Sequence, residues 1–359
     1  MEILVTTKQP IKLDAIRSYL NTLNQQYRLE TIDCGGLGLP EQPINCGIYC
    51  VKKRIDYAKS KINRKYDMVI SIENDLTKTD STFMDCAHVR IEVGEIVGIG
   101  VSKPINCPID LTTYEKDEIV VYSKYIQGYR KTGGKILAEK DGCDPHNWMT
   151  QFGYIRKDQI VDGLNKAFVN LRQNIEYCKE LKNSYQIYEN FPKPGVSFKY
   201  FYSLFSSDHM YKLSHILESK YTGYGIDTIF ALETRGLILG TLLSNILKIT
   251  FIPVQKPGKV PGNTISRDFE KEYGSDTLQI SKDLLSARLI SDCLIVDDVI
   301  ATGGTIEATI NMIKETCNSK VNIEILALDQ VESLRDKAIN KIGNNYSILF
   351  KDIDNIYIK

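Results

Sequence analysis

Residues 294–305 constrain the fold more than any other stretch of this chain of 359 residues. An apolar run that ends at Val296 is followed by the acid pair Asp297-Asp298 and by the small-residue segment Ala301-Thr-Gly-Gly-Thr305. This order predicts a buried strand, a tight loop and a helix that begins near Ile306. Ligands of open α/β sheets bind at the carboxyl ends of such strands. The stretch therefore predicts an α/β fold with a ligand site after this strand.

The same stretch has the chemistry of a sugar-phosphate site. Small residues let backbone N–H groups converge on an anion, and the helix N-terminus adds a favourable dipole. The hydroxyls of Thr302 and Thr305 can donate to phosphate oxygens, while Asp297 and Asp298 can accept from sugar hydroxyls. A plain strand end with an Asp cap explains one acid and one glycine, but not both acids together with Thr-Gly-Gly-Thr. A Walker loop is excluded because the run contains no Gly-Lys-Ser/Thr.

Further apolar runs alternate with helical spacing along the whole chain. The expected strands cover residues 3–6, 68–72, 88–93, 228–232, 250–254, 293–296 and 321–328, and the expected helices cover 11–20, 46–60 and 163–181. Such alternation predicts a mainly parallel sheet with helices on both faces. The length suits about two domains, and the two halves share no repeat. We therefore predict two α/β domains, residues 1–178 and 179–359, joined by a polar linker over residues 179–190.

Composition and cysteine usage limit the class of protein. Equal numbers of basic and acidic residues, 45 of each, and a hydrophobic content of 43% exclude a disordered chain and a strongly basic nucleic-acid coat. No apolar run approaches the roughly 18 residues of a membrane span, and the first residues lack the basic region of a signal peptide. Nine cysteines, an odd number, fit free thiols better than a disulfide framework or a Cys/His metal site. We expect a soluble, cytoplasmic protein without nucleic-acid or membrane partners.

Four segments of the second half resemble type I phosphoribosyltransferases, and among these the adenine phosphoribosyltransferase family. Residues 297–305 resemble its phosphoribosyl-pyrophosphate motif. Asn190-Phe-Pro-Lys-Pro-Gly-Val-Ser-Phe198 resembles its base-binding segment, and Leu232-Glu-Thr-Arg-Gly-Leu-Ile-Leu-Gly240 its pyrophosphate-binding turn. Pro253-Val-Gln-Lys-Pro-Gly-Lys-Val-Pro-Gly262, with Glu270-Lys-Glu-Tyr-Gly274, resembles its mobile catalytic loop. The resemblance implies a type I phosphoribosyltransferase fold with a mainly parallel sheet.

The resemblance also implies an activity, the formation of AMP and pyrophosphate from adenine and phosphoribosyl pyrophosphate by a homodimer. Mg²⁺ would assist with Asp298 as a ligand, Glu272 would handle the base proton, and the cations would stabilise the departing pyrophosphate. The implied catalytic residues are Arg235, Lys256, Lys259 and Glu272. The implied phosphoribosyl-pyrophosphate site consists of Asp297, Asp298, Ala301, Thr302, Gly303, Gly304 and Thr305. The implied base site consists of Val196, Ser197, Phe198 and Lys199.

Two alternatives to an adenine transferase stay open. Ala301 stands where oxopurine transferases carry an acid, which favours a 6-aminopurine. Lys199-Tyr200 and Gln255 depart from the family pattern, so a transferase for another purine base is one alternative. The other is a regulator that binds phosphoribosyl pyrophosphate without turnover. Lys256, Lys259 and Glu272 favour the enzyme, since a sensor has no need of them.

The first half resembles the inosine/xanthosine triphosphatase family. The resemblance rests on Thr6-Thr7 with Pro10-Ile-Lys12, on Leu39-Pro-Glu-Gln-Pro43, on a strand that ends at Glu73, and on the strand region at 83–93. It implies an α/β NTP-pyrophosphatase-like fold with a mixed sheet, and hydrolysis of non-canonical purine triphosphates such as ITP and XTP. Thr7, Lys12 and Glu41 would bind the nucleotide, and Glu73 would bind Mg²⁺ or activate water.

Two departures from that pattern leave another reading of the first half open. Asn74-Asp75 stands where the family has small residues, and its Thr-Arg pair is missing near residues 160–162. A degenerate domain, kept for assembly or regulation, is therefore the alternative.

Overall fold

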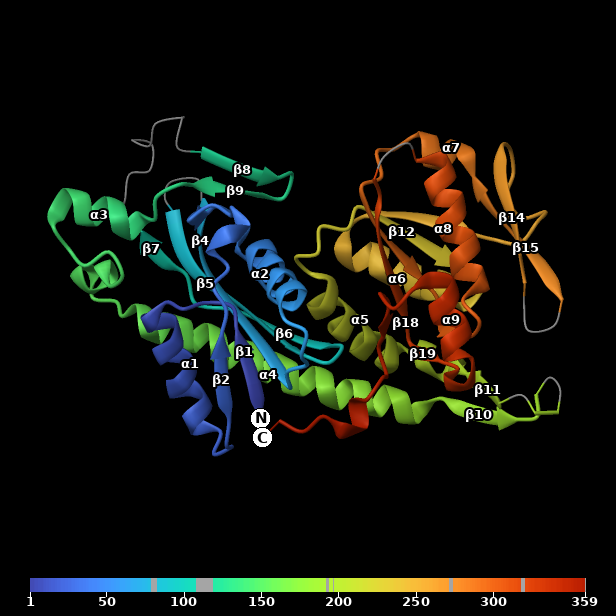
Figure 1. Ribbon diagram of the computed structural model, residues 1–359, viewed down its shortest axis with the longest axis horizontal. Coiled ribbons are helices and arrows are strands. Elements are labelled where there is room, and N and C mark those ends of the chain that lie inside the picture. The colour runs from blue at the N-terminus through green and yellow to red at the C-terminus, as the bar shows by residue number, and fades with distance from the viewer. Residues whose placement is uncertain are drawn as a thin grey trace. The chain divides into compact units, whose positions relative to one another are not determined.

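The computed structural model describes residues 1–78, 83–107, 119–191, 194–195, 197–270, 274–317 and 320–358. It divides into two compact units, which Figure 1 shows mainly in blue to green and in yellow to red. Unit 1 comprises Met1–Ile175, Thr222–Tyr224 and Asn355–Lys359, and unit 2 comprises Glu176–Tyr221 and Gly225–Asp354. The boundary lies inside helix α4 (Arg156–Ser184). The predicted linker is therefore wrong, because residues 179–190 form the end of α4 and strand β10 (Gln186–Glu189).

Unit 1 is built on a mixed sheet in the order β2-β1-β4-β5-β6. Strand β1 pairs in parallel with β2 and β4, whereas β4, β5 and β6 pair with one another antiparallel and β7 adds to β5. The bounds of these strands are Glu2–Val5 (β1), Arg28–Thr31 (β2), Met68–Lys78 (β4), Phe83–Val93 (β5), Ile96–Val101 (β6) and Ile105–Cys107 (β7). The helices are α1 (Pro10–Thr22), α2 (Gly47–Lys61), α3 (Gly133–Asp141) and the first part of α4. A second, antiparallel sheet joins β3 (Gln42–Pro43), β9 (Ile126–Tyr129) and β8 (Ile119–Ser123).

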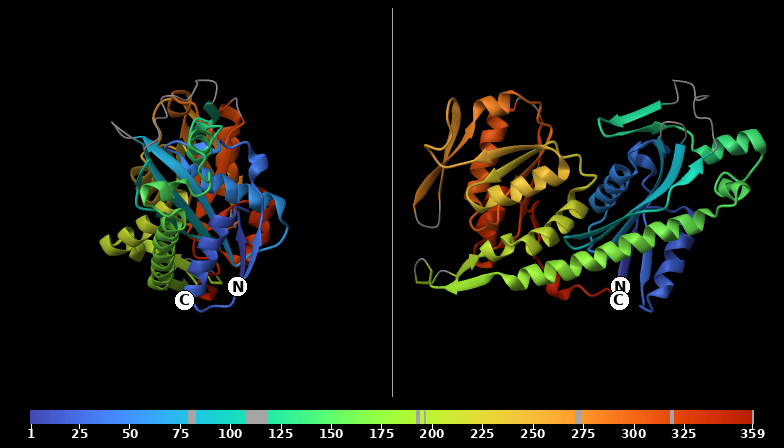
Figure 2. Two further views of the ribbon diagram at one scale, coloured as in Figure 1. Left: turned by 90° about the vertical axis from the view of Figure 1, so that its left-hand side faces the viewer. Right: turned by 180° about the vertical axis from the view of Figure 1, so that it is seen from behind.

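Helix α4 packs closely on the sheet of unit 1, as both views of Figure 2 show. Two glycines of β6 make this approach possible. A Cβ at Gly98 would lie 2.3 Å from the carbonyl oxygen of Ala167, and a Cβ at Gly100 would lie 2.3 Å from that of Gly163. The side-chain amide of the buried Asn174 donates to the backbone carbonyl of Val97 at 2.9 Å, so this carbonyl of strand β6 has a hydrogen-bond partner. The helix predicted at residues 163–181 is confirmed, and it is longer than its apolar periodicity indicated.

Unit 2 is built on a wholly parallel sheet in the order β13-β12-β16-β18-β20. The strand bounds are Thr228–Leu232 (β12), Thr250–Val254 (β13), Asp292–Val296 (β16), Asn322–Ala327 (β18) and Ser347–Ile348 (β20). The four strands predicted for this half are therefore confirmed. Smaller pairs form beside the sheet, β10 with β11 (Ser197–Tyr200), β14 (Thr264–Glu270) with β15 (Ser275–Ser281), and β17 (Val299–Ile300) with β19 (Asp329–Gln330).

The faces of the parallel sheet are covered by different helices. Helix α6 (Arg235–Leu247) lies against β12 and β13, with α5 (Ser207–Tyr221) packed on it. On the other face α8 (Gly304–Thr316), α9 (Arg335–Ile342) and the hairpin β14–β15 enclose one core with Phe230, Ile252 and Ile295. Because both faces are covered, all five residues of β12 are buried, as the continuous apolar run predicts. No helix within the described ranges is long and apolar enough to cross a membrane.

The order of the strands fixes where a ligand of unit 2 can bind. The chain enters the sheet at β12, turns to β13 on one side, and then places β16 on the other side. The gap between the carboxyl ends of β12 and β16 is therefore a topological switch point, where open α/β sheets bind their ligands. Glu233 follows β12 there, and Asp297 follows β16.

Candidate functional site

The turns after β12 and β16 meet closely at the switch point. Gly236, the second residue of α6, makes this possible, because a Cβ there would lie 2.7 Å from the carbonyl oxygen of Val296. The peptide bond between Glu233 and Thr234 in the same turn is cis. This contact brings Arg235 to the acid pair, with Arg235 Nε 2.9 Å from Asp298 Oδ2.

The adjacent acids Asp297, which is half-buried, and Asp298, which is buried, outnumber the one cation beside them, Arg235. Asp298 is 5% exposed, and its backbone N–H donates to Asp297 Oδ1 at 2.9 Å. Burial, and then the charge of Asp298, raise the pKa of Asp297 well above its ordinary value despite the nearby guanidinium. Groups that bring positive charge or hydroxyl donors would relieve this excess. The pair therefore fits ribose hydroxyls and Mg²⁺, which prefers carboxylate oxygens and water.

The loop that follows the acid pair delivers backbone N–H groups to the start of α8. Gly303 has a positive φ of 78° and caps the helix, whose first residue is Gly304. A Cβ at Gly304 would lie 2.7 Å from the carbonyl oxygen of Glu270, so this position also needs glycine. Ala301 is exposed, while Thr302 and Thr305 are half-buried. The helix has 13 residues, long enough for its N-terminus to attract a phosphate.

Lys256 and Lys259 are held at this turn by Glu233, a residue that the sequence analysis did not identify. The backbone N–H of Lys256 donates to Glu233 Oε2 at 3.0 Å, and the ammonium of Lys259 pairs with Glu233 Oε1. Burial acts to raise the pKa of Glu233, but the two lysines outweigh it and hold the pKa below its ordinary value. The ammonium of Lys256 lies 3.3 Å from Asp276. The predicted proton-transfer residue, Glu272, lies outside the described residues.

The predicted base-binding segment lies on β11, and only part of it faces the acid pair. The guanidinium of Arg235 lies 5.4 Å from the ring centre of Phe198, and its NH1 donates to the carbonyl of Lys199 at 3.1 Å. The side chain of Ser197 donates instead to Glu189 at 3.0 Å, and the ammonium of Lys199 pairs with Asp329 at 2.7 Å. Val196 lies outside the described residues.

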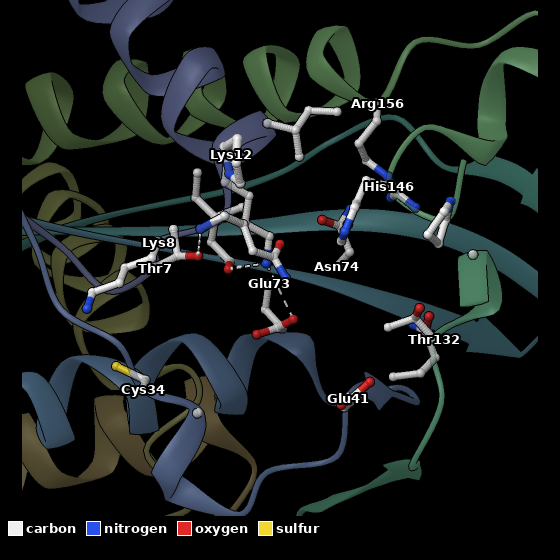
Figure 3. A pocket seen from close by; sticks show the side chains of 18 of the residues that line it. Thr7, Lys8, Lys12, Cys34, Glu41, Glu73, Asn74, Thr132, His146 and Arg156 are labelled. Carbon is white, nitrogen blue, oxygen red and sulfur yellow. Dashed lines mark hydrogen bonds and ion pairs between the residues drawn. The ribbon is translucent and has the colours of Figure 1, made fainter. Parts of the chain in front are cut away.

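Unit 1 contains a separate cavity of about 550 Å³, shown in Figure 3. It lies at the end of β1 and beside residues 72–74 of β4, and the turn after β1, the first residues of α1 and the start of α4 line it. The strand predicted to end at Glu73 continues instead to Lys78. All four residues predicted for this half, Thr7, Lys12, Glu41 and Glu73, line the cavity. Arg54 and Arg156, which belong to no motif in the sequence, line the cavity as well. Arg156 binds Asp85 through both NH groups, at 2.5 and 3.1 Å.

Glu73 does not fit the predicted role of a magnesium ligand, because basic groups face both of its oxygens. Arg54 Nε lies 2.5 Å from Oε2, and Lys12 Nζ lies 3.6 Å from Oε1. Burial acts to raise the pKa of Glu73, but Arg54 and Lys12 outweigh it and hold the pKa below its ordinary value. Figure 3 shows Lys12 beside Glu73 and Glu41 apart from them, and Glu41 pairs with Lys135 at 2.5 Å.

The charge of the cavity favours an anionic ligand. Five basic residues line it, Lys8, Lys12, Arg54, Lys135 and Arg156, against three acidic ones, Asp33, Glu41 and Glu73. Burial lowers the pKa of Lys12, although Glu73 opposes this effect. A second negative group would therefore stabilise the charged form of Lys12.

Comparison with known proteins finds relatives of the second half of the chain. Residues 208–351 match the family model described as a phosphoribosyl transferase domain. An adenine phosphoribosyltransferase of Shewanella sp. (strain W3-18-1) is 41% identical over 146 residues, which are 40% of this chain and 78% of the relative. One from Photorhabdus laumondii is 36% identical over 172 residues, 46% of this chain and 93% of the relative. The crystal structure of adenine phosphoribosyltransferase from Saccharomyces cerevisiae is 32% identical, with a TM-score of 0.43 over 48% of this chain and 98% of that one.

Proposed function

Because the chain belongs to the adenine phosphoribosyltransferase family through its second half, we propose that unit 2 transfers phosphoribose from phosphoribosyl pyrophosphate to adenine. The products are AMP and pyrophosphate. The observation that carries the proposal is the acid pair Asp297-Asp298 at the switch point, with Arg235 bound to Asp298 and the loop into α8 following the pair in sequence. Anion-binding backbone and carboxylates at one sheet edge suit a ligand that has both a phosphate and free hydroxyls.

Each part of the site has a proposed role in this reaction. The loop at residues 301–305 binds the 5′-phosphate, and the acid pair accepts the ribose hydroxyls. Asp298 would also hold Mg²⁺, which supplies positive charge to the departing pyrophosphate when bound. Arg235 adds a fixed positive charge, while the ammonium of Lys259 exchanges Glu233, and that of Lys256 exchanges Asp276, for the pyrophosphate. Glu272 would handle the base proton by its match to the loop motif. A homodimer is part of the proposal, and sedimentation of the purified chain tests it.

Pyrophosphate release tests the transferase directly. The intact protein is assayed with Mg²⁺, phosphoribosyl pyrophosphate and each purine base in turn, and release that requires adenine is expected. Release with another base instead would make the chain a transferase for that base. Binding of phosphoribosyl pyrophosphate without release would favour a regulator over the enzyme. Asp298→Asn should lower turnover about a hundredfold, since it removes one charge that the transition state needs.

The cavity of unit 1 supports a second activity. We propose that it binds the triphosphate of a non-canonical purine nucleotide such as ITP or XTP and hydrolyses it. Because Arg156 is paired with Asp85, one surplus positive charge remains among the residues that line this cavity of about 550 Å³, which favours an anion of nucleotide size. The triphosphate would pair with Lys12 and Arg54, which Glu73 occupies in its absence.

Nucleotide hydrolysis by the intact chain tests this second proposal. ITP and XTP are supplied separately, ATP serves as the comparison, and the released phosphate and pyrophosphate are both measured. Lys12→Ala should weaken ITP binding at least about tenfold, because it removes a buried cation. Lys65→Ala, which removes an exposed lysine of the same unit outside the cavity, is the matched control. Binding of ITP with no product would leave unit 1 a nucleotide-binding domain, and no binding at all would refute the proposal.

A further inference from the structure

Four residues of unit 2 close a ring of contacts around the proposed transferase site. Arg235 binds Asp298 through Nε at 2.9 Å and the carbonyl of Lys199 through NH1 at 3.1 Å. The ammonium of Lys199 lies 2.7 Å from Asp329 Oδ2. The backbone N–H of Asp329 donates to the carbonyl of Asp298 at 3.1 Å and completes the ring. The ring therefore joins β11, the turn after β12, the turn after β16, and β19.

Asp329 is the member of this ring whose side chain no proposed chemical step uses. Its carboxylate is nevertheless fully engaged. Oδ2 accepts from Lys199 and, at 2.5 Å, from the hydroxyl of Tyr185, while Oδ1 accepts from the backbone N–H of Gln330 at 2.7 Å. Burial, and then the hydrogen bond to Asp329, raise the pKa of Tyr185, so its hydroxyl remains a donor at neutral pH.

The partners of Asp329 are themselves fixed by packing. The aromatic ring of Tyr185 packs on that of Phe201 in a tilted arrangement, with ring centres 4.7 Å apart, and stacks on that of Phe350 at 6.0 Å. The backbone of Asp329 pairs with Val299, directly after the acid pair. The backbone of Asp329 is therefore held in place, and its carboxylate can fix the position of the ammonium of Lys199.

Strand β11 needs such a fixing point. It pairs with β10 alone in the sheets of the described chain, so the central parallel sheet does not set its position. The contacts of Lys199 with Asp329 and Arg235 instead connect β11 to the acid pair. Phe198, the neighbour of Lys199, is thereby held at 5.4 Å from the guanidinium of Arg235.

We propose that Asp329 is a positioning residue for the purine base, acting through Lys199 to hold Phe198 against the Arg235–Asp298 pair. This inference rests on the proposed transferase function and adds a residue that no motif identified. Loss of the carboxylate leaves the ammonium of Lys199 with one neutral acceptor, the carbonyl of Gln330 at 3.0 Å, and so weakens the hold on β11 beside Arg235. The phosphate loop and the acid pair do not depend on the side chain of Asp329. The base site should therefore suffer more than the phosphoribosyl-pyrophosphate site.

Steady-state kinetics of Asp329→Ala test the proposal. The KM for adenine should rise about tenfold, equivalent to about 1.4 kcal/mol, while kcat and the KM for phosphoribosyl pyrophosphate change less than about threefold. Glu332→Gln, which neutralises an exposed carboxylate three residues away, is the control and should leave all three constants unchanged. Lys199→Met should reproduce the adenine effect. The double variant should be no worse than either single one, because the two residues act through one contact.

Two results would overturn the positioning role. The first is an adenine KM within about twofold of wild type in Asp329→Ala. The second is a parallel change in all three constants together with a lower thermal midpoint, which a merely structural residue would give. Absence of pyrophosphate release from the wild-type chain would instead refute the proposed function. In that case the Kd for AMP, measured by calorimetry, decides the inference, and an equal Kd in wild type and Asp329→Ala contradicts it.

Discussion

Replacement of Gly236 by alanine tests how closely the two halves of the proposed transferase site must approach. Ordinarily Gly→Ala in a helix is stabilising, by up to about 1 kcal/mol, because alanine loses less backbone entropy. Here the new Cβ would lie 2.7 Å from the carbonyl oxygen of Val296 and 3.2 Å from the Cα of Asp297. Both are backbone atoms and cannot rotate away. Relief therefore requires the first turn of α6 to move from the end of β16.

The size of the effect follows from that overlap. To reach an ordinary contact of about 3.4 Å from 2.7 Å, the backbones must separate by about 0.7 Å. Overpacking of this kind costs about 1–3 kcal/mol, which exceeds the gain in helix propensity. An overpacking cost of about 2 kcal/mol, less a gain in helix propensity of about 1 kcal/mol, leaves unit 2 of Gly236→Ala about 1 kcal/mol less stable. Arg235 would move with the turn, and transferase turnover should fall about tenfold or more.

The position of the only tryptophan lets one experiment separate the two units. Trp148 lies in unit 1, so its fluorescence during urea unfolding follows that unit. The fluorescence transition of Gly236→Ala should match that of wild type, while the far-UV circular dichroism should show earlier unfolding. Hydrogen exchange should be faster in peptides that cover α6 and β16.

A matched substitution on the same helix provides the control. Asn245→Ala replaces an exposed residue of α6 and should be neutral or slightly stabilising, with full activity. Gly236→Ala that is as stable and as active as Asn245→Ala would refute the close-approach argument, because the clash would then have been absorbed without moving Arg235.

Three further predictions concern single charges. Burial and the charge of Asp298 raise the pKa of Asp297, so the folded form holds a proton that the unfolded chain has lost above about pH 4. The stability of unit 2 should therefore fall as pH rises from there to the raised pKa, and Asp297→Asn should flatten this dependence in urea midpoints. Lys259→Ala should raise the KM for phosphoribosyl pyrophosphate about tenfold with less than about 1 kcal/mol change in stability, because the lysine is half-exposed. Arg54→Met leaves the 4% exposed Glu73 with one cation and should destabilise unit 1 by about 3 kcal/mol, measured by tryptophan fluorescence.

The four longer strands of the parallel sheet in unit 2 could be predicted from the sequence because their signals are local. A strand covered on both faces must be apolar throughout, so β12 and β16 appear as short continuous apolar runs. The contact between Arg235 and Asp298 was also predictable in outline, although the two residues are 63 positions apart in the sequence. Both residues follow strands of one parallel sheet, and the carboxyl ends of such strands lie at the same edge.

The contacts of Glu233 and Asp329 could not be predicted in this way. Glu233 meets Lys259 because the chain returns to the sheet edge after β13, and Asp329 meets Lys199 from 130 residues away. Asp329 lies in no recognised motif, and the motif at residues 232–240 that contains Glu233 does not indicate which cations it meets. Arg156 could not be predicted for the same reason. It reaches the cavity of unit 1 because α4 begins beside that cavity. Such partners depend on how elements pack, and a one-dimensional pattern does not contain that information.

Glu73 shows why a residue can lie in a predicted cavity and yet have surroundings that do not suit its predicted role. An acid at the end of a strand, beside a turn that leads into a helix, suggests a magnesium ligand when only its neighbours in sequence are considered. The charge around it is set instead by Lys12 on α1 and Arg54 on α2, which approach from separate parts of the chain. A buried carboxylate whose two oxygens already face cations has little remaining affinity for another cation, because those cations already offset the cost of burying its charge. Under the proposed hydrolase function, Lys12 and Arg54 would supply the positive charge that a triphosphate needs, and Glu73 would hold these two cations until the triphosphate binds.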